Sequence, residues 1–451
     1  MKKVIFVFLV TVLLFGCTLD KNIDIQGESI SRKWTFIIYM AADNDLDSAA
    51  MNNFKQLETV NYGNAPISIL VLLDRHPSGG GWSDTRVYEV RRDPSSISNP
   101  IIRSPRLDCP ELGLTKNSEI DLNTADPFVL SGFIDFAKRA YPAEHYALFI
   151  WGHGSGWRSD GNATGSNTPF KAFAADDTSG DYMLLPDFGW AIEGKGLSLI
   201  GFDTCFGAVM EVAYQVRNSA ALLVGSEGLV HSRGWNYKAL FDDFISKPHL
   251  SITDLGDSIQ NQYRENYPTL TNATISQIQL SHVENLFNKF NAFSGAVATS
   301  ITTKETKNLV MDVILNNVEQ HYLSPTQSIT PVDLFIDVHD FCIKINDLRY
   351  DITSDPGEQN AIAAAANELE SALALAIPSS WAQNGTTKKI GVFVIPIIGI
   401  ATPGTTHDEA YIRGSGDLNK SAFVEDSTGW VPNTTLQSSS LLDKLFYWFQ
   451  G

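Results

Sequence analysis

The sequence has few cysteines and few basic residues for its length. Its 451 residues include only 4 cysteines, and none lies in a Cys-x-x-Cys or Cys/His spacing that would indicate a zinc site, so we expect no bound metal. Lysine and arginine number 33 against 51 acidic residues, a net charge of −18 that disfavours nucleic acid and attracts basic peptides. The length allows two or three domains, and no internal repeat is present.

No apolar run reaches the roughly 20 residues that a membrane-spanning helix needs. The N-terminal apolar run, Val4–Phe15, follows two lysines, as in a signal peptide, and its end, LFGC, resembles a bacterial lipobox. We therefore interpret residues 1–17 as a lipoprotein signal peptide with acylated Cys17 as the new N-terminus, and residues 18–32 as a flexible tether. This predicts a lipid-anchored protein of the cell envelope, exposed to the periplasm or the exterior. An ordinary secretory signal, in which Cys17 has no role, is the alternative.

The stretch Leu197–Gln215 has the pattern of a buried strand followed by a helix. Between the two patterns lies Asp203-Thr204-Cys205-Phe206-Gly207. Cys205 is thus predicted at the carboxyl end of a strand, where open α/β sheets bind their ligands. If a helix begins directly after it, the helix dipole favours the thiolate, which is the nucleophilic form.

A second apolar strand, His145–Trp151, leads into the glycine-rich sequence GHGSG. Its histidine, His153, precedes Cys205 by 52 residues. A histidine about 50 residues before a nucleophilic cysteine is the caspase spacing. Strands alternate with helices through this half of the chain, which predicts an α/β fold with a mostly parallel sheet and helices on both faces. We therefore expect His153 and Cys205 at the same edge of that sheet.

Four segments in this order resemble the clostripain family of cysteine peptidases, the C11 group of the caspase-like clan. They are WTFIIYMAADNDLD, GHGSGW, FDTCFGAVMEV, and Gly225-Ser226-Glu227 with Gly234-Trp235-Asn236-Tyr237. The resemblance implies a caspase-like α/β/α sandwich over residues 33–240 and a catalytic dyad of His153 and Cys205. It also implies an oxyanion hole formed by the backbone N–H groups of Gly154 and Cys205, and an endopeptidase that cleaves peptides or proteins after arginine or lysine.

The resemblance also assigns acidic and basic residues near the site. It places Asp203 at the floor of the S1 pocket, whereas its position alone equally suits a cap of a helix starting at Thr204. Glu227 is a candidate second acid of that pocket. Family members often cut themselves in the loop after the histidine, which predicts self-cleavage at Lys171 or Arg158.

Other residues carry open alternatives. The resemblance implies that the chemistry needs no cofactor, but some relatives need calcium. Candidate calcium ligands are Asp176, Asp177 and Asp181, which otherwise form a solvated acidic loop. Cys109 and Cys342 form either a disulfide or two unrelated buried thiols. The acidic turn at residues 43–47 is either a helix cap or a functional element.

Residues 241–451 contain further strand and helix patterns, including helices over 332–345 and 359–376, and we interpret them as an α+β subdomain packed on the catalytic sheet. A serine hydrolase of the α/β type is disfavoured because the chain has no G-x-S-x-G elbow. A non-catalytic, caspase-like surface lipoprotein that acts as a binding module is the remaining alternative. We expect a monomer.

Overall fold

The strand β1 (Trp34–Ala42) consists of nine consecutive residues that are all buried. A strand buried on both faces belongs in the middle of a sheet that is covered on both sides. In the computed structural model, which describes residues 32–99, 101–156, 173–270, 272–322, 334–383, 390–394 and 441, β1 pairs in parallel with strands on both of its sides.

The central sheet has eight strands in the order β12-β9-β8-β7-β4-β1-β2-β3. Parallel pairings join β8, β7, β4, β1 and β2, whereas β3, β9 and β12 add antiparallel edges. The predicted α/β fold with a mostly parallel sheet is thus confirmed. Besides β1, the strands are β2 (Ile67–Arg75), β3 (Arg86–Glu89), β4 (His145–Trp151), β7 (Leu199–Asp203), β8 (Leu222–Gly225), β9 (Thr274–Gln279) and β12 (Ser379–Ala382).

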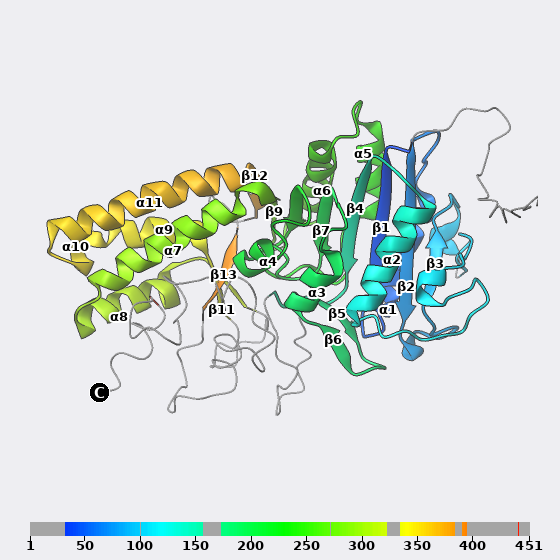
Figure 1. Cartoon of the computed structure of the whole chain (residues 1–451), viewed down its shortest axis with the longest axis horizontal. Coiled ribbons are helices and arrows are strands. Elements are labelled where there is room, and N and C mark those ends of the chain that lie inside the picture. Colours follow the sequence, from blue (N-terminus) through cyan, green and yellow to red (C-terminus); the bar gives the residue numbers. More distant parts are fainter. Residues whose placement is uncertain are drawn as a thin grey trace, which may run out of the picture. The chain divides into compact units, whose positions relative to one another are not determined.

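Helices cover both faces of this sheet (Figure 1), and each face has its own hydrophobic cluster. Alternate residues of β1 enter opposite clusters: Ile37 and Tyr39 one, Phe36 and Ile38 the other. The face of Phe36 is covered by α1 (Asp47–Thr59), α5 (Tyr237–Ser246) and α6 (Ile252–Asn266). The face of Ile37 is covered by α2 (Pro127–Ala140), α3 (Leu185–Ile192), α4 (Met210–Gln215) and α7 (Val283–Ser300).

Residues beyond 240 extend the sheet as well as covering it. Strand β9 pairs with β8, and β12 pairs with β9, so the predicted subdomain of residues 241–451 shares the central sheet. The same region forms a three-stranded sheet of β10 (Gln320–Tyr322), β11 (Leu334–Asp337) and β13 (Gly391–Val394). Beside it α7 and α11 (Pro356–Ala376) lie side by side (Figure 1). Other helices in the described part of this region are α8 (Lys304–Asp312), α9 (Val338–Asp347) and α10 (Arg349–Ile352).

Local sequence patterns predicted a helix boundary correctly where the contacts lie within that one helix. Asp126 caps α2 as its spacing suggests, accepting a hydrogen bond from the Phe128 N–H at 2.8 Å. The helix predicted over 332–345 is wrong in its first half, because residues 334–337 pair with β10 and β13. Asp337 then caps α9 by accepting from the Asp340 N–H.

The disulfide alternative for Cys109 and Cys342 is also settled. Both are free thiols buried in the hydrophobic cluster on the α2 face. Burial raises the pKa of each thiol to about 12, which makes both unreactive.

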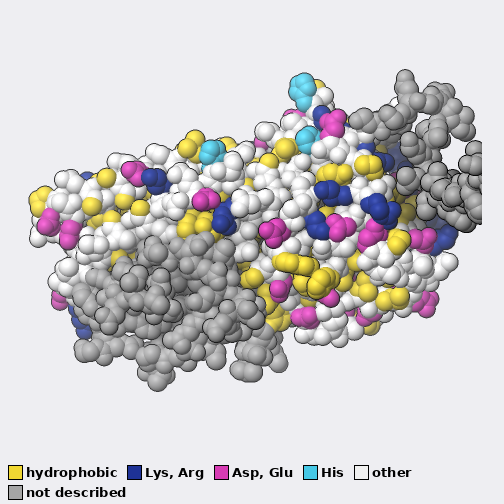
Figure 2. All heavy atoms as spheres, in the orientation of Figure 1, with side chains coloured by type: hydrophobic (Ala, Val, Ile, Leu, Met, Phe, Trp, Pro, Cys, Tyr) yellow, Lys and Arg dark blue, Asp and Glu magenta, His cyan; other side chains and the backbone are white. Residues whose placement is uncertain are grey.

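The described helices include none that is both long and apolar enough to cross a bilayer. On the face shown in Figure 2, acidic side chains are interspersed with the basic ones, so the lysines and arginines drawn there form no separate stripe. The predicted signal peptide with Cys17, and the predicted cleavage positions Arg158 and Lys171, lie outside the described residues.

Candidate active site

His153 and Cys205 follow two neighbouring strands at equal distances. Strands β4 and β7 pair in parallel, and their last paired residues are Trp151 and Asp203. His153 and Cys205 therefore each lie two residues beyond the same pair, at the carboxyl edge of the sheet. Parallel strands deliver residues at equal offsets to the same rim. The structure thus brings together the two loops that the sequence pattern selects.

Gly154 lies where the two loops touch. A Cβ atom on Gly154 would lie 2.4 Å from the Cys205 carbonyl oxygen and 2.7 Å from the Thr204 hydroxyl. Both distances are far below a normal contact, so only glycine lets the histidine loop approach the cysteine loop this closely. Any side chain here would push the histidine loop away from the cysteine loop.

Cys205 is not at a helix N-terminus, so the predicted helix-dipole activation is wrong. Residues 205–208 form a turn, with Phe206 in the left-handed region at φ 56°, and α4 begins only at Met210. Burial, partly opposed by a hydrogen bond from the Val230 N–H to Sγ at 3.2 Å, raises the pKa of the Cys205 thiol to about 11. The resting group is therefore a thiol, which needs a neighbouring base before it can attack.

His153 has a carboxylate partner that sequence reasoning missed. Its Nε2 lies 2.6 Å from Oδ1 of Asp45, which follows β1, the strand next to β4. Three neighbouring strands thus deliver Asp45, His153 and Cys205 to one edge. Asp45 thereby occupies Nε2 and leaves Nδ1 as the other ring nitrogen for proton transfer.

The acidic turn at residues 43–47 does not cap α1, so its interpretation as a helix cap is wrong. The N-cap is Leu46 and no side chain caps the helix. Instead, both carboxylate oxygens of Asp47 accept from the Arg75 guanidinium at 2.7 and 2.8 Å, and Asn44 donates to the carbonyl oxygens of Ala41 and Ala175. These contacts fix the turn that carries Asp45. The sequence signals for this were the place of the turn after a largely apolar strand and its inclusion in the segment WTFIIYMAADNDLD.

Asp203 is buried and does not cap a helix. Both of its carboxylate oxygens accept from the Trp235 N–H, at 3.1 and 2.9 Å, and Oδ2 also accepts from the Tyr237 hydroxyl at 3.1 Å. Burial outweighs these hydrogen bonds and raises the pKa of Asp203 to about 7. Trp235 and Tyr237 are core residues, 2% and 0% exposed.

Gly234 keeps the space beside the Asp203 carboxylate free of a side chain. Its φ is +63°, and a Cβ atom there would lie 2.6 Å from Asp203 Oδ2. The backbone conformation and the close approach both require glycine. The carboxylate is thus bordered by backbone at one point instead of by a packed side chain.

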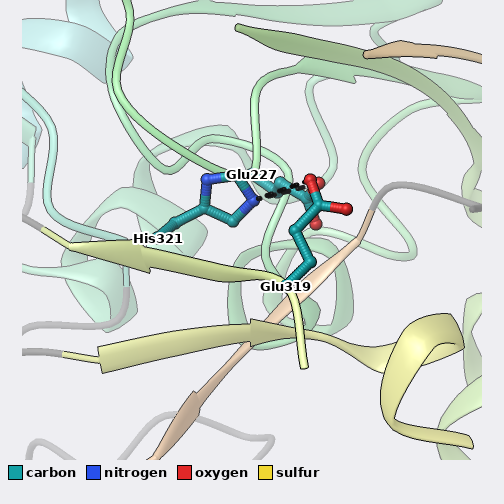
Figure 3. Close-up of side chains that lie close together, drawn as sticks. All are labelled: Glu227, Glu319 and His321. Atoms are coloured by element: carbon teal, nitrogen blue, oxygen red, sulfur yellow. Dashed lines mark ion pairs between the residues drawn. The ribbon is translucent and has the colours of Figure 1, made fainter. Parts of the chain in front are cut away.

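Glu227 has surroundings different from those of Asp203. Its side chain is fully buried and lies 3.3 Å from Nε2 of His321 on β10, with Glu319 beside it (Figure 3). Asp203 by contrast contacts Trp235 and Tyr237. The contacts of Glu227 therefore give no support to its predicted role in an S1 pocket.

The three predicted calcium ligands do not form one cluster of donor atoms, although Asp176 and Asp181 pair across two short strands. Asp181 accepts from the Asn123 amide at 2.7 Å and Asp177 is exposed. Asp176 instead lies with Asp43 and Asp74, and one oxygen of each of these buried carboxylates is within 4.8 Å of the others. Because oxygen-only donors suit Ca²⁺, these three are the residues that would hold calcium.

A cavity of about 650 Å³ lies elsewhere, between α1 and the β2–β3 edge. Its described lining includes Lys55, Arg75, Trp82 and Tyr88, but none of the predicted site residues. The placement of the chemistry therefore rests on the strand register and not on this cavity.

Comparisons with known proteins agree with this architecture. A profile of the Clostripain family, Peptidase_C11, matches residues 38–355. Clostripain from Hathewaya histolytica is 29% identical over 242 residues, 48% of this chain and 43% of that protein, so the match spans less than half of that relative.

Two similar solved structures are C11 proteases. One is a secreted C11 cysteine protease from Bacteroides thetaiotaomicron in complex with an irreversible peptide inhibitor, with a TM-score of 0.56 and 16% identity over 84% of this chain and 96% of that one. The other is an inactive zymogen C11 protease from Parabacteroides distasonis, with a TM-score of 0.54 and 17% identity over 80% and 92%. These identities support the fold, and the family profile covers more than half of the chain. The chain therefore belongs to the clostripain family of cysteine peptidases, family C11.

Proposed function

We propose that the protein is a cysteine endopeptidase that cleaves after arginine or lysine, with Cys205 as nucleophile and His153 as general acid and base. The observation that carries this proposal is the register of β4 and β7, in which both residues follow the pair Trp151–Asp203 by two positions. Family membership supports the reaction class.

The proposed reaction begins with proton transfer from the Cys205 thiol to His153, because burial disfavours a resting thiolate. The sulfur then attacks the scissile carbonyl carbon, and the backbone N–H groups of Cys205 and Gly154 stabilise the oxyanion. His153 protonates the leaving amine, which leaves a thioester. It then takes a proton from the water that hydrolyses this thioester.

The proposed preference for basic residues rests on Asp203. A buried carboxylate is a strong and selective partner for a guanidinium or ammonium group. A cationic P1 side chain beside this carboxyl would favour its ionised form, since the pKa of Asp203 is about 7 in the free protein.

Amide hydrolysis tests the proposed function directly. We expect turnover of fluorogenic arginine or lysine amides, and its loss after treatment with an arginyl thiol-alkylating inhibitor. Cleavage only after aspartate or asparagine would move the protein to another branch of the clan. No turnover of any amide by the full chain would favour the binding-module alternative.

We expect Asp45 to act as a positioning residue for His153. Asp45→Ala should lower kcat about tenfold with little change in KM, because the side chain orients the base and does not touch the substrate. Asp45→Asn, which can still hydrogen-bond Nε2, should retain more activity. The Asp45 side chain is 77% exposed, so neither change should affect the melting temperature.

A matched control is Asp242→Asn on α5, another exposed carboxylate with an ion-pair partner. A loss in Asp45→Ala that appears in KM instead of kcat, or that equals the effect of Asp242→Asn, would contradict the positioning role.

We also propose self-processing in the loop after His153. Arg158 and Lys171 are the basic residues of this loop and match the proposed specificity. The relative from Parabacteroides distasonis was solved as an inactive zymogen, which supports a processing step. We expect purified wild-type protein to separate into two fragments on a denaturing gel, with the new N-terminus after residue 171 or 158. Cys205→Ala should stay uncut, and an active wild type that remains a single chain would refute this.

We further propose that Cys17 carries a lipid that holds the protein at the cell envelope. The lysines followed by an apolar run that ends in LFGC support this. A lipid anchor would leave the folded unit free to meet peptide substrates outside the membrane.

A further inference from the structure

One imidazole and two carboxylates converge at a second place in the fold. His321 and Glu319 lie on and beside β10, and Glu227 follows β8, 92 residues earlier than Glu319. One donor atom of each side chain lies within 4.8 Å of the other two. Figure 3 shows Nε2 of His321 directed toward the carboxyl groups of Glu227 and Glu319. The mechanism proposed for Cys205 uses none of these three residues.

The distances are too long for the hydrogen bonds of an ordinary ion pair. Nε2 lies 3.3 Å from Oε1 of Glu227 and 3.7 Å from Oε1 of Glu319. Charge-assisted N–H···O bonds are about 2.7–2.9 Å long. The His321 side chain is only 3% exposed, and its buried Nε2 atom makes no hydrogen bond. A proton on this nitrogen would therefore have no well-placed acceptor.

The same distances suit ligands of one metal ion. Zn–N and Zn–O bonds of about 2.0–2.2 Å in a tetrahedron place neighbouring donor atoms about 3.3–3.6 Å apart. If Nε2 carries a lone pair, it faces carboxylate oxygens that repel it. A cation between them changes this repulsion into three coordinate bonds. We propose that Glu227, Glu319 and His321 bind a divalent metal ion of the Zn²⁺ class.

The donor set favours this ion over the alternatives. Imidazole is a ligand for Zn²⁺ and its neighbours, whereas all-oxygen sites suit Ca²⁺ and Mg²⁺. Two carboxylates and one neutral imidazole balance the charge of a divalent ion. The Glu319 side chain is 28% exposed, which provides an entry path and room for a water as fourth ligand. The set contains no cysteine, and its three residues are spread over two distant segments, so no Cys/His spacing in the sequence indicates this site.

The site would be structural and would connect two parts of the fold. The segment at Glu227 supports the cysteine loop: Phe206 N–H donates to the Gly228 carbonyl at 3.0 Å and Ala208 N–H to the Ser226 carbonyl at 2.8 Å. His321 belongs to the three-stranded sheet of β10, β11 and β13. A bound ion would tie that sheet to the support of the Cys205 loop.

Zinc binding by the full chain tests the proposal. Untagged Cys205→Ala protein, which stays intact and lacks the reactive thiol, is stripped with a chelator and titrated with Zn²⁺ against a chromophoric competitor. We expect one tight equivalent per chain, a higher melting temperature with Zn²⁺, and with Co²⁺ a visible spectrum typical of four-coordinate N/O sites. His321→Gln and Glu319→Gln should each weaken binding by at least about 10–100-fold, the range known for mutations merely next to metal ligands.

A variant that should stay folded and a matched control make the zinc titration interpretable. Glu319 is partly exposed, so Glu319→Gln should remain folded even if His321→Gln does not. The matched control is the double variant His249→Gln/Glu265→Gln, whose side chains are exposed, and it should bind Zn²⁺ like the parent. Absence of a tight equivalent, or equal affinity in Glu319→Gln and the control, would overturn the site. The cluster would then be a protonated histidine paired with carboxylates.

Discussion

Replacing Cys205 with alanine is expected to abolish amide hydrolysis, lowering kcat by at least about 10³-fold, as removal of a nucleophile does in other hydrolases. Of the free cysteines that the structure describes, Cys205 alone is only partly buried, whereas Cys109 and Cys342 lie in the core. Cys109→Ala and Cys342→Ala should therefore keep wild-type kcat. Turnover of a fluorogenic arginine amide measures all three variants, and mass spectrometry should locate an arginyl alkylating inhibitor on Cys205.

The pH dependence of alkylation separates the nucleophile from its base. Because the pKa of the Cys205 thiol is about 11, His153→Ala should react slowly at pH 7 and faster as the pH rises toward 11. Wild type should react at neutral pH, since His153 accepts the proton. Equal rates for the two proteins at pH 7 would contradict the role of His153 as base, and residual hydrolysis above about 1% in Cys205→Ala would contradict the role of Cys205 as nucleophile.

Replacing Asp203 with asparagine is expected to lower kcat/KM for arginine and lysine amides by about 10²–10³-fold. Loss of one partner from a buried, hydrogen-bonded charge pair changes binding by about 2–5 kcal/mol, and each 1.4 kcal/mol is tenfold. Asparagine keeps the shape and can still accept from the Trp235 N–H and bond to Tyr237, so the loss should reflect charge and not misfolding. A neutral P1 amide is the control substrate, and an equal loss on both substrates would contradict the S1 assignment.

Stability against pH gives an independent measure of Asp203. The pKa of the folded group, about 7, is raised above the unfolded value of about 3.9, so the folded state keeps a proton that the unfolded chain releases. The stabilisation is fully present below pH 4 and is lost as the pH rises through 7, by about 4 kcal/mol in total. In Asp203→Asn this part of the pH dependence should disappear. Denaturant unfolding at pH 5 and pH 8 measures it, and an unchanged difference between the two pH values would contradict the buried, protonated carboxyl.

Much of the catalytic half could be predicted because local patterns decide it. The short apolar runs at β1, β4 and β7 are typical of parallel strands that are covered on both faces, and their length of five to nine residues favours strands over helices. Asp126 caps α2 by accepting a hydrogen bond from the N–H of Phe128, two residues along the chain. His153 and Cys205 were found from spacing because both follow such strands, and parallel pairing then brings equal offsets to one edge.

Local patterns failed where a long-range contact competed with them. Residues 334–337 carry a helical pattern, but pairing with β10 and β13 makes them a strand. The Asp43–Asp47 turn looks like a cap, but Arg75 binds Asp47 and His153 binds Asp45. The helix expected directly after Cys205 starts later, because residues 206 and 208 are held by carbonyl groups of the next loop.

By itself, the sequence determined which strands the reactive residues follow, the acidic character of the protein and the family resemblance. These depend on residue type and on neighbours within a few positions. Only the tertiary structure decided that Asp45 meets His153 across 108 residues, that burial sets the pKa of Asp203 and Cys205, and that Glu227 faces His321. The physical reason is that burial and contact between distant segments are properties of the packed chain, and no local pattern encodes either of them.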